Sequence, residues 1–379
     1  MTANDLAARR VALDALVRIE DGHAYANLVM PALFERSSLD QRDRKFVTEL
    51  VYGTTRMRRA LDAALEPHLK RDVEPLVRTV LRLGAYQLLY ADVAPHAAVS
   101  TSVSLAPKRA QGFVNAVLRR VSEAGLIETD DIGTRLSYPD WIVSRLRADL
   151  GDDDAVAALE AMNDAPRPHA RADGYVQDPA SGLVAELVDA QPGHRVADLC
   201  AAPGGKATAL AHRVGDGVVV AADIRPGRVE LVAQNAASTG TAAALSPVIA
   251  DGFAPPLRRA AFDRVLVDAP CSGLGVLHRR ADARWRIEHD AVPTMASAGW
   301  RLLLAASELV ATGGVLVYSV CTLTAAETVD VGSWAVDQLD GFTALDPPGA
   351  PWSRRGAGAL LLPQTIGSDG MYILRLRRS

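Results

Sequence analysis

The sequence predicts an α/β protein with an all-helical N-terminal domain and a C-terminal domain built on an open parallel sheet. Three observations support this fold class. The length of 379 residues fits two domains at about 150 residues each. Apolar residues recur at helical spacing throughout residues 1–125. From residue 176 onwards, short β-branched runs alternate with longer helical stretches, which is typical of a sheet covered by helices on both faces.

The composition excludes several classes of protein. Hydrophobic residues make up 49% and charged residues 23%, which excludes a disordered chain, a collagen and a coiled coil. Charged residues interrupt every apolar stretch before the ~18 residues that a membrane span needs. The first ten residues carry charge where a signal peptide needs an apolar segment. We therefore expect a cytoplasmic protein with no membrane partner.

Cysteine usage and charge give weaker indications. Cys200, Cys271 and Cys321 are far apart and odd in number, which argues against a disulfide framework. No CxxC or HxxxH pair offers a zinc site, so we expect no metal. The net charge of −4 hides a small basic excess in residues 1–130, a weak sign of a nucleic-acid partner. A GC-rich genome explains most of the excess of arginine over lysine.

The elements follow in chain order. Residues 1–125 form a helical domain, with helical faces around Ala8–Ile19, Phe46–Met57, Val77–Leu89 and Phe113–Val121. Residues 126–175 form a connector with one helix after Pro139 and another after Gly151, and prolines then prevent a helix at 165–168. Residues 176–379 form the sheet domain. Its expected strands are Arg195–Leu199, Val218–Asp223, Ser246–Ala250, Arg264–Asp268, Gly314–Val320 and a terminal pair, Gly358–Leu362 with Met371–Arg375.

The first candidate site is the loop between Asp198 and Lys206, where a buried strand leads through small residues into a helix. Small residues let a ligand approach the backbone, and the helix N-terminus offers free N–H groups. Any tight strand–helix turn can carry Gly-Gly, however. The loop lacks the spacings of dinucleotide and phosphate loops, which disfavours a nicotinamide cofactor and ATP.

Two acidic residues end the second and third strands. Asp223 lies about 20 residues beyond the loop, where an acid can hydrogen-bond the ribose hydroxyls of an adenosine. The alternative is a helix cap before Pro226. Asp251 either accepts a hydrogen bond from an adenine amino group or caps a turn.

The ends of the fourth and fifth strands carry an acid and two thiols. Asp268 and Cys271 follow the fourth strand, and Cys321 follows the fifth. These strands are neighbours in a doubly wound sheet, so the two cysteines would flank one cleft. A buried, inert cysteine is the usual alternative, but Cys271 stands in a polar loop.

This combination suits methylation of a pyrimidine at C5. That carbon is too weakly nucleophilic to take a methyl group until a thiolate adds to C6. A carboxyl group hydrogen-bonded to the ring at N3 stabilises the charge that develops there. A second thiol can assist when the first is expelled. Spacing alone does not decide which cysteine is the nucleophile.

The motifs DLCAAPGGKAT, DAPCSGLGVL with Arg284-Trp285, and VYSVCTLTAAET resemble those of the RNA cytosine-C5 methyltransferase family. The stretches LVYGTTR, LRLGAYQLLY, HAAVSTSV and GFVNAVLRR resemble an N-terminal NusB-like RNA-binding domain. With residues 175–181 and 369–372, the resemblance extends over nearly the whole chain, and it is to the members that act on small-subunit ribosomal RNA. It implies a Rossmann-like catalytic domain that uses S-adenosylmethionine.

The resemblance also implies roles. Cys321 would be the nucleophile, Cys271 would help release the product, and Asp268 would lie between cofactor and base. Asp223 would hold the ribose and Asp251 the adenine. Cys200, Ala201, Ala202, Pro203, Gly204, Gly205 and Lys206 would surround S-adenosylmethionine. The helical domain would bind small-subunit ribosomal RNA. The candidate phosphate contacts are Arg56, Arg58, Arg59, Lys108, Arg109, Arg119 and Arg120. The alternative is that these residues only form a solvated helix face.

The chain departs from the family at two places. Val320 precedes the expected nucleophile, where relatives usually have threonine. Between Met162 and Tyr175 the chain lacks a substantial α/β subdomain of the family that helps dock RNA. Alternatives are therefore a transfer-RNA methyltransferase of the same chemistry, an RNA-binding assembly factor that only holds the cofactor, and a small-molecule methyltransferase. One bundle with one catalytic domain suits a monomer.

Overall fold

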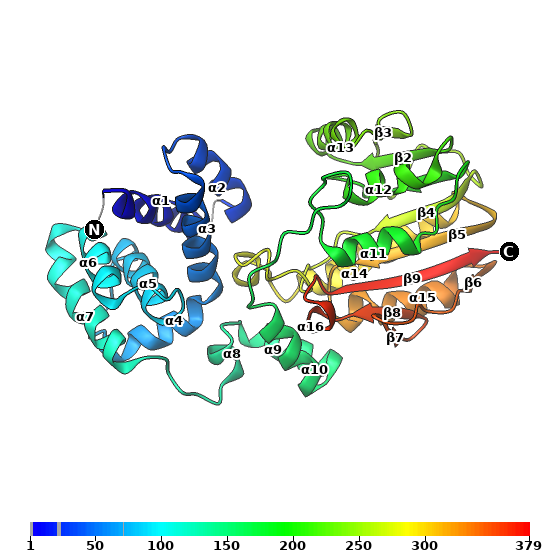
Figure 1. Ribbon diagram of the computed structural model, residues 1–379. Helices are drawn as coiled ribbons and strands as arrows, with labels where there is room; N and C mark the ends of the chain where they lie inside the picture. The colour runs from blue at the N-terminus through cyan, green and yellow to red at the C-terminus, as the bar shows by residue number, and fades with distance from the viewer. Residues whose placement is uncertain (1–2, 21–23, 71) are drawn as a thin grey trace. The chain divides into compact units, whose positions relative to one another are not determined.

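The computed structural model describes residues 3–20, 24–70 and 72–379. The chain divides into two compact units. The helical unit comprises Met1–Ser144 together with Leu277–Arg286, and the sheet unit comprises Arg145–Val276 and Ile287–Ser379. Figure 1 shows helices alone in the first unit and a sheet with helices on both faces in the second. This confirms the predicted fold class.

The helices of the first unit begin and end at recognisable signals. Asp40 caps one helix by accepting a hydrogen bond from Asp43 N at 2.8 Å, and prolines begin two others. Gly125, with φ +73°, ends the last long one. The elements are α1 (Ala3–Glu20), α2 (Ala26–Glu35), α3 (Gln41–Arg56), α4 (Arg58–Leu65), η1 (Glu66–His68), α5 (Pro75–Leu89), α6 (Pro95–Leu105), η2 (Lys108–Ala110) and α7 (Gln111–Ala124).

The predicted helical faces form the core of this unit. Val47, Leu50 and Val51 of α3 are fully buried with residues of α1, α5 and α7. Close approach of α3 and α5 requires a glycine, because a Cβ at Gly53 would lie 2.0 Å from the ring of Tyr86. The helical period in the sequence therefore identified the packed faces, except at Phe113, which is exposed.

The expected connector contains α8 (Ile132–Arg135), α9 (Asp140–Leu150) and α10 (Asp152–Ala161). The division between the two units falls inside α9, so the connector is shared between them. Beyond α10 the chain continues without a helix to residue 178, with one isolated bridge between Ala170 and Val176.

The sheet has the order β3-β2-β1-β4-β5-β9-β8-β7, with β6 paired to β9. Strands β1 to β5 are parallel, and β9 runs antiparallel to β5. Helices α11, α12 and α13 lie along one face, and α14 and α15 along the other (Figure 1). Strand bounds are β1 (Arg195–Asp198), β2 (Val218–Asp223), β3 (Leu245–Ile249), β4 (Phe262–Asp268), β5 (Val310–Val320), β6 (Phe342–Ala344), β7 (Ser353–Arg355), β8 (Gly358–Leu361) and β9 (Met371–Arg378).

After the connector, the helices of this unit are α11 (Pro179–Leu187), α12 (Gly205–Val214), α13 (Pro226–Ser238), α14 (Ala291–Ser307), η4 (Ala325–Glu327), α15 (Val329–Gln338) and α16 (Pro363–Ile366). The short helix η3 (Ala283–Trp285) belongs to the helical unit. All seven predicted strands are present. The short strands β6 and β7 were not predicted. Within the described ranges, no helix is long and apolar enough to span a membrane.

One segment between β4 and α14 packs with the helical unit rather than with its neighbours in sequence. Arg284 is fully buried there, with its guanidinium 3.9 Å from the ring centroid of Tyr138 and a hydrogen bond to Ser137 O at 3.1 Å. Trp285 Nε1 donates to Thr55 O at 2.7 Å. Arg284 and Trp285, which the sequence analysis grouped with the DAPCSGLGVL motif, thus contact residues of the helical unit.

Candidate active site

The predicted site residues come together at the carboxyl ends of the parallel strands. Asp198 ends β1, Asp223 ends β2, Asp268 ends β4 and Cys321 follows β5. Strand β1 lies between β2 and β4, and β5 lies beside β4. The strand order reverses between β1 and β4, which is where open α/β sheets bind ligands.

The loop after β1 has a fixed shape. Gly204 has φ +109°, and a Cβ there would lie 3.2 Å from the backbone of Val232. Two side chains of α13 hold the loop carbonyls: Arg228 donates to Ala202 O at 2.6 Å and Asn235 donates to Pro203 O at 2.8 Å. The loop therefore presents small side chains and the start of α12 to the strand ends.

Asp198 stands at the start of the first candidate site, but the sequence analysis gave it no role of its own. Its side chain is fully buried, and neither carboxylate oxygen has a hydrogen-bond partner among the described residues. Burial, with a smaller contribution from Asp268, raises the pKa of Asp198 to about 7. A carboxyl group left without a partner here fits a ligand that carries a positive charge or a hydrogen-bond donor. The sequence signal was an acid at the end of a strand that leads directly into the small-residue loop.

Asp223 and Asp251 follow neighbouring strands, and each caps a turn. Oδ1 of the buried Asp223 accepts from Arg225 N at 3.0 Å, and its Oδ2 lies 3.7 Å from Arg228 Nε. The exposed Asp251 accepts from Phe253 N at 2.9 Å. The turn-capping alternative is therefore realised at Asp251, whereas the helix-cap alternative is not realised at Asp223, because the N-cap residue of α13 is Arg225 and no side chain in the described part of the chain caps that helix.

The sulfur atoms of Cys271 and Cys321 lie 3.4 Å apart. The hydrogen bond between them lowers the pKa of Cys321 and raises the pKa of Cys271. Cys321 is therefore the thiol of the pair that ionises more readily. Cys200 differs, because burial raises the pKa of its thiol well above its usual range.

Both carboxylate oxygens of Asp268 have partners. Lys206 Nζ donates to Oδ2 at 2.7 Å, and Ser319 Oγ donates to Oδ1 at 2.7 Å. Burial alone would lower the pKa of Lys206, but the charge and hydrogen bond of Asp268 raise it overall. The carboxylate of Asp268 is thus held in one orientation, and it interacts electrostatically with Cys321.

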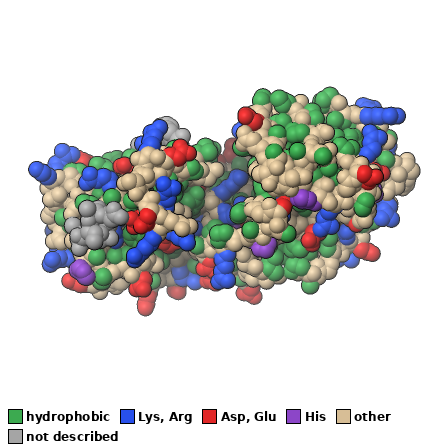
Figure 2. Space-filling model, turned by 45° about the horizontal axis from the view of Figure 1, so that its top comes forward, with side chains coloured by type: hydrophobic (Ala, Val, Ile, Leu, Met, Phe, Trp, Pro, Cys, Tyr) green, Lys and Arg blue, Asp and Glu red, His purple; other side chains and the backbone are tan. Residues whose placement is uncertain are grey.

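Several basic residues considered for phosphate contacts have other roles. The prediction for Arg56 was wrong, because its side chain is buried and donates to His278 O at 2.9 Å. Arg59 donates to Asp131 at 2.9 Å and to Asp140, and Arg58 lies over the ring of Trp285. The exposed candidates are Lys108, Arg109, Arg119 and Arg120, of which Arg109 pairs with Glu74. Figure 2 shows basic and acidic side chains interspersed over the face in view.

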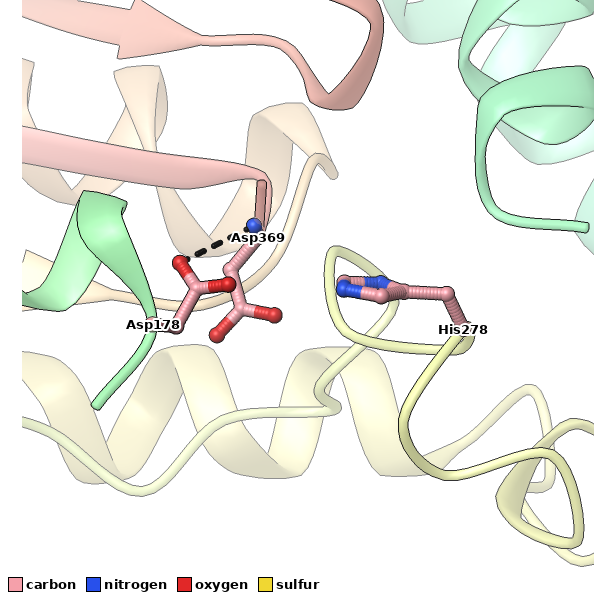
Figure 3. A group of neighbouring side chains, drawn as sticks. All are labelled: Asp178, His278 and Asp369. Atoms are coloured by element: carbon pink, nitrogen blue, oxygen red, sulfur yellow. Dashed lines mark hydrogen bonds between the residues drawn. The ribbon is translucent and has the colours of Figure 1, made fainter. Parts of the chain in front are cut away.

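Asp178, directly before α11, lies next to Asp369, which precedes β9 in the chain (Figure 3). Asp369 N donates to Asp178 Oδ1 at 3.1 Å, and the same oxygen accepts from Ala180 N at 2.9 Å. Asp178 therefore acts as a helix cap. His278, drawn in the same view, belongs to the helical unit.

The shortened connector contacts the cofactor loop directly. Arg171 donates to Gly205 O at 2.6 Å and to Thr208 Oγ1 at 2.9 Å, so it binds the first turn of α12. Asp173 pairs with Arg171 and His212, which lowers its pKa to about 2. A cavity of about 900 Å³ lies beside this segment, and none of the predicted site residues lines it.

Comparison with known proteins identifies the families that the two parts of the chain match. Residues 185–377 match the sequence model of the family described as 16S rRNA methyltransferase RsmB/F, and residues 6–123 match the NusB family. The chain is 35% identical to ribosomal RNA small subunit methyltransferase B of Thermus thermophilus, covering 98% of this chain and 97% of that protein. It is 37% identical to the putative methyltransferase Rv1407 of Mycobacterium tuberculosis, covering 98% and 96%. That alignment spans 450 positions, more than the 379 residues of this chain, so the relative has residues opposite gaps here.

Solved structures show the same fold. The crystal structure of PH0851 matches with a TM-score of 0.81 at 19% identity, covering 100% of this chain and 99% of that one. A methyltransferase homolog protein from Pyrococcus horikoshii matches with a TM-score of 0.55 at 23% identity, covering 66% and 98%. At these identities the likeness concerns the fold alone.

Proposed function

Because the chain belongs to the 16S rRNA methyltransferase RsmB/F family, we propose that it methylates C5 of a cytosine in small-subunit ribosomal RNA, in the cytoplasm. The chain is an RNA methyltransferase, and S-adenosylmethionine is its cofactor. The cytosine, its C5 position and the ribosomal substrate are the parts that we propose. The observation that carries them is the pair of thiols 3.4 Å apart beside Asp268.

In this reaction the Cys321 thiolate adds to C6 of the base and forms an S–C6 bond. The displaced electron pair makes C5 nucleophilic, so that C5 takes the methyl group. Loss of the C5 proton then restores the double bond and breaks the S–C6 bond. The lowered pKa of Cys321 supports its assignment as the nucleophile. Cys271 assists the release step from its position beside that sulfur.

Asp268 orients the base. Lys206 and Ser319 hold its two oxygens, which fixes the carboxylate next to the thiols. A carboxyl group that shares a proton with N3 of the cytosine stabilises the negative charge that develops on the ring during addition at C6.

The cofactor supplies the methyl group when bound. The fixed loop from Cys200 to Lys206 would hold its methionine part, and the partnerless carboxylate of Asp198 would take its ammonium group. Asp223 would accept from the ribose hydroxyls and Asp251 from the adenine amino group. Buried Asp198 and Asp223, exposed Asp251 and the small residues at the strand ends support these assignments.

The helical unit would bind the ribosomal RNA. Its match to the NusB family supports this role. Lys108, Arg109, Arg119 and Arg120 are the exposed basic residues that we propose for phosphate contacts.

The shortened connector supports a second candidate, an assembly factor that binds RNA and cofactor without turnover. The test is methyl transfer from labelled S-adenosylmethionine to unmodified, protein-free small-subunit ribosomal RNA, with transfer RNA alongside and Cys321→Ala as the control. We expect 5-methylcytosine in ribosomal RNA with the native chain and none with the variant. Label in transfer RNA alone would contradict the substrate, and RNA and cofactor binding without label would favour the assembly factor.

A further inference from the structure

Glu327 is a buried carboxylate that the proposed reaction does not use. It ends η4, six residues after Cys321, and its side chain is 1% exposed. Its carboxylate accepts from Ser272 N and Ser272 Oγ, both at 2.6 Å, and from Thr324 Oγ1 at 2.7 Å. A buried charge with this many donors is held in one position.

The partners of Glu327 come from both cysteine loops. Ser272 directly follows Cys271, and Thr322, whose Oγ1 lies 3.3 Å from the same carboxylate, directly follows Cys321. The hydroxyls of Ser272 and Thr322 are also hydrogen-bonded to each other at 2.8 Å. One carboxylate therefore binds the residue next to each thiol.

We propose that Glu327 is a positioning residue that sets the separation between the Cys271 and Cys321 thiols. A cap of its own turn would bind only residues 322–328, but two of its shortest hydrogen bonds reach a loop 55 positions away. Tyr318, at the buried end of β5, donates to Glu327 O at 2.8 Å and fixes the backbone as well.

The separation matters because the thiol pair acts as a unit. Rates that depend on two groups in contact fall steeply when one moves by about 1 Å. This inference rests on the proposed function only for its effect on methylation, since the thiol separation itself is measurable without RNA or cofactor.

The direct test is disulfide formation by diamide, in which the two thiols lose two electrons and two protons to the reagent and an S–S bond forms. Peptide mapping follows the Cys271–Cys321 bond in the full-length chain. We expect Glu327→Ala to slow this bond at least about tenfold, because the thiols lose their fixed proximity. Glu327→Gln keeps an acceptor and a similar shape, so it should restore most of the rate. Glu230→Ala, at an exposed glutamate on α13, is the matched control and should leave the rate unchanged.

Thr324→Val removes one partner of the carboxylate while keeping the side-chain shape, and keeps the test valid if Glu327→Ala does not fold. It should slow the disulfide less than Glu327→Ala, and the alkylation of Cys321 by iodoacetamide should need a higher pH in both variants. Wild-type rates of disulfide formation in folded Glu327→Ala, or in Thr324→Val where Glu327→Ala does not fold, would overturn the proposal. Absence of methylation by the native chain would instead count against the proposed function, and the thiol measurements would stand.

Discussion

The ammonium group of Lys206 lies 2.7 Å from a carboxylate oxygen of Asp268. Lys206 is the second residue of α12, directly after the loop that follows β1, and Asp268 ends β4 three residues before Cys271. The pair therefore joins the two halves of the site, which are separate in the sequence. Any shift of the cofactor loop changes the electrostatic environment of the thiols.

Removing one partner of this ion pair should destabilise the sheet unit. Asp268→Asn leaves the charge of Lys206, whose side chain is only 10% exposed, without its counter-ion. Loss of one partner of a buried pair costs about 3 kcal/mol or more in the free energy of unfolding. Thermal unfolding should therefore shift to lower temperature, whereas Glu308→Gln, at an exposed pair with Arg259, should change it little. An unchanged unfolding temperature in Asp268→Asn would contradict a stabilising role for the Lys206–Asp268 ion pair.

Cofactor affinity should depend on pH through Asp198. Its pKa of about 7 lies above the ordinary 3.8, so the free protein binds an extra proton between these values and loses stability as pH rises through them. A cationic group bound beside Asp198 expels that proton. Affinity should therefore increase from about pH 6 to about pH 7.5, by up to about tenfold per pH unit.

Calorimetric titration with S-adenosylmethionine in buffers of different ionisation enthalpy measures both the affinity and the released proton. Asp198→Asn should bind more weakly and show neither the pH dependence nor the proton release. If Asp198→Asn keeps the wild-type pH dependence of cofactor affinity, Asp198 does not contact the cofactor.

Cys271→Ala should accumulate a covalent protein–RNA adduct. The variant keeps the nucleophile but lacks the thiol that assists release. Its adduct should form best at a higher pH than turnover of the native chain, because the hydrogen bond from Cys271 lowers the pKa of Cys321. A denaturing gel detects the adduct as a slowly migrating band, and the double variant with Cys321→Ala is the control. A variant that turns over normally without such a band would exclude the release role.

Arg284 should stabilise the helical unit although it lies between β4 and α14 in sequence. Arg284→Ala leaves the carbonyl of Ser137 without its donor and removes the contact with Tyr138, at a cost of about 3 kcal/mol. Arg284→Lys should recover little, since lysine lacks the planar group that stacks on the ring. Thermal unfolding checks this against the exposed Arg42→Ala, expected to change the free energy of unfolding by less than about 0.5 kcal/mol.

Much of the fold was predictable because periodicity reports burial. Strands β2 and β5 contain apolar runs, and the helices of the first unit have regular buried faces. Strands β6 and β7 have three residues each, too few for an alternation to show. The packing of residues 277–286 with the helical unit depends on contacts more than 140 positions apart, such as Arg284 with Ser137, which no local pattern encodes.

The candidate site was predictable where a residue follows a strand. Asp223, Asp268 and Cys321 all lie at the expected edge. The pairing of Glu327 with Ser272 was not, because a buried glutamate has no signature until its donors are brought in from another loop. Arg56 illustrates the reverse error, since its charge suggested an RNA contact but its side chain is buried against the 277–286 segment.

The central claim is that Cys321 forms the bond to the target base. The most direct measurement uses small-subunit ribosomal RNA transcribed with 5-fluorocytosine, whose fluorine cannot leave C5 as a proton does, so that the methylated adduct stays on the protein. Incubation with S-adenosylmethionine, nuclease and protease digestion, and mass spectrometry identify the modified peptide. The account predicts a methylated fluorocytosine bound to the sulfur of Cys321. A base bound to Cys271, or 5-methylcytosine formed from normal RNA with no adduct from the fluorinated RNA, would contradict it.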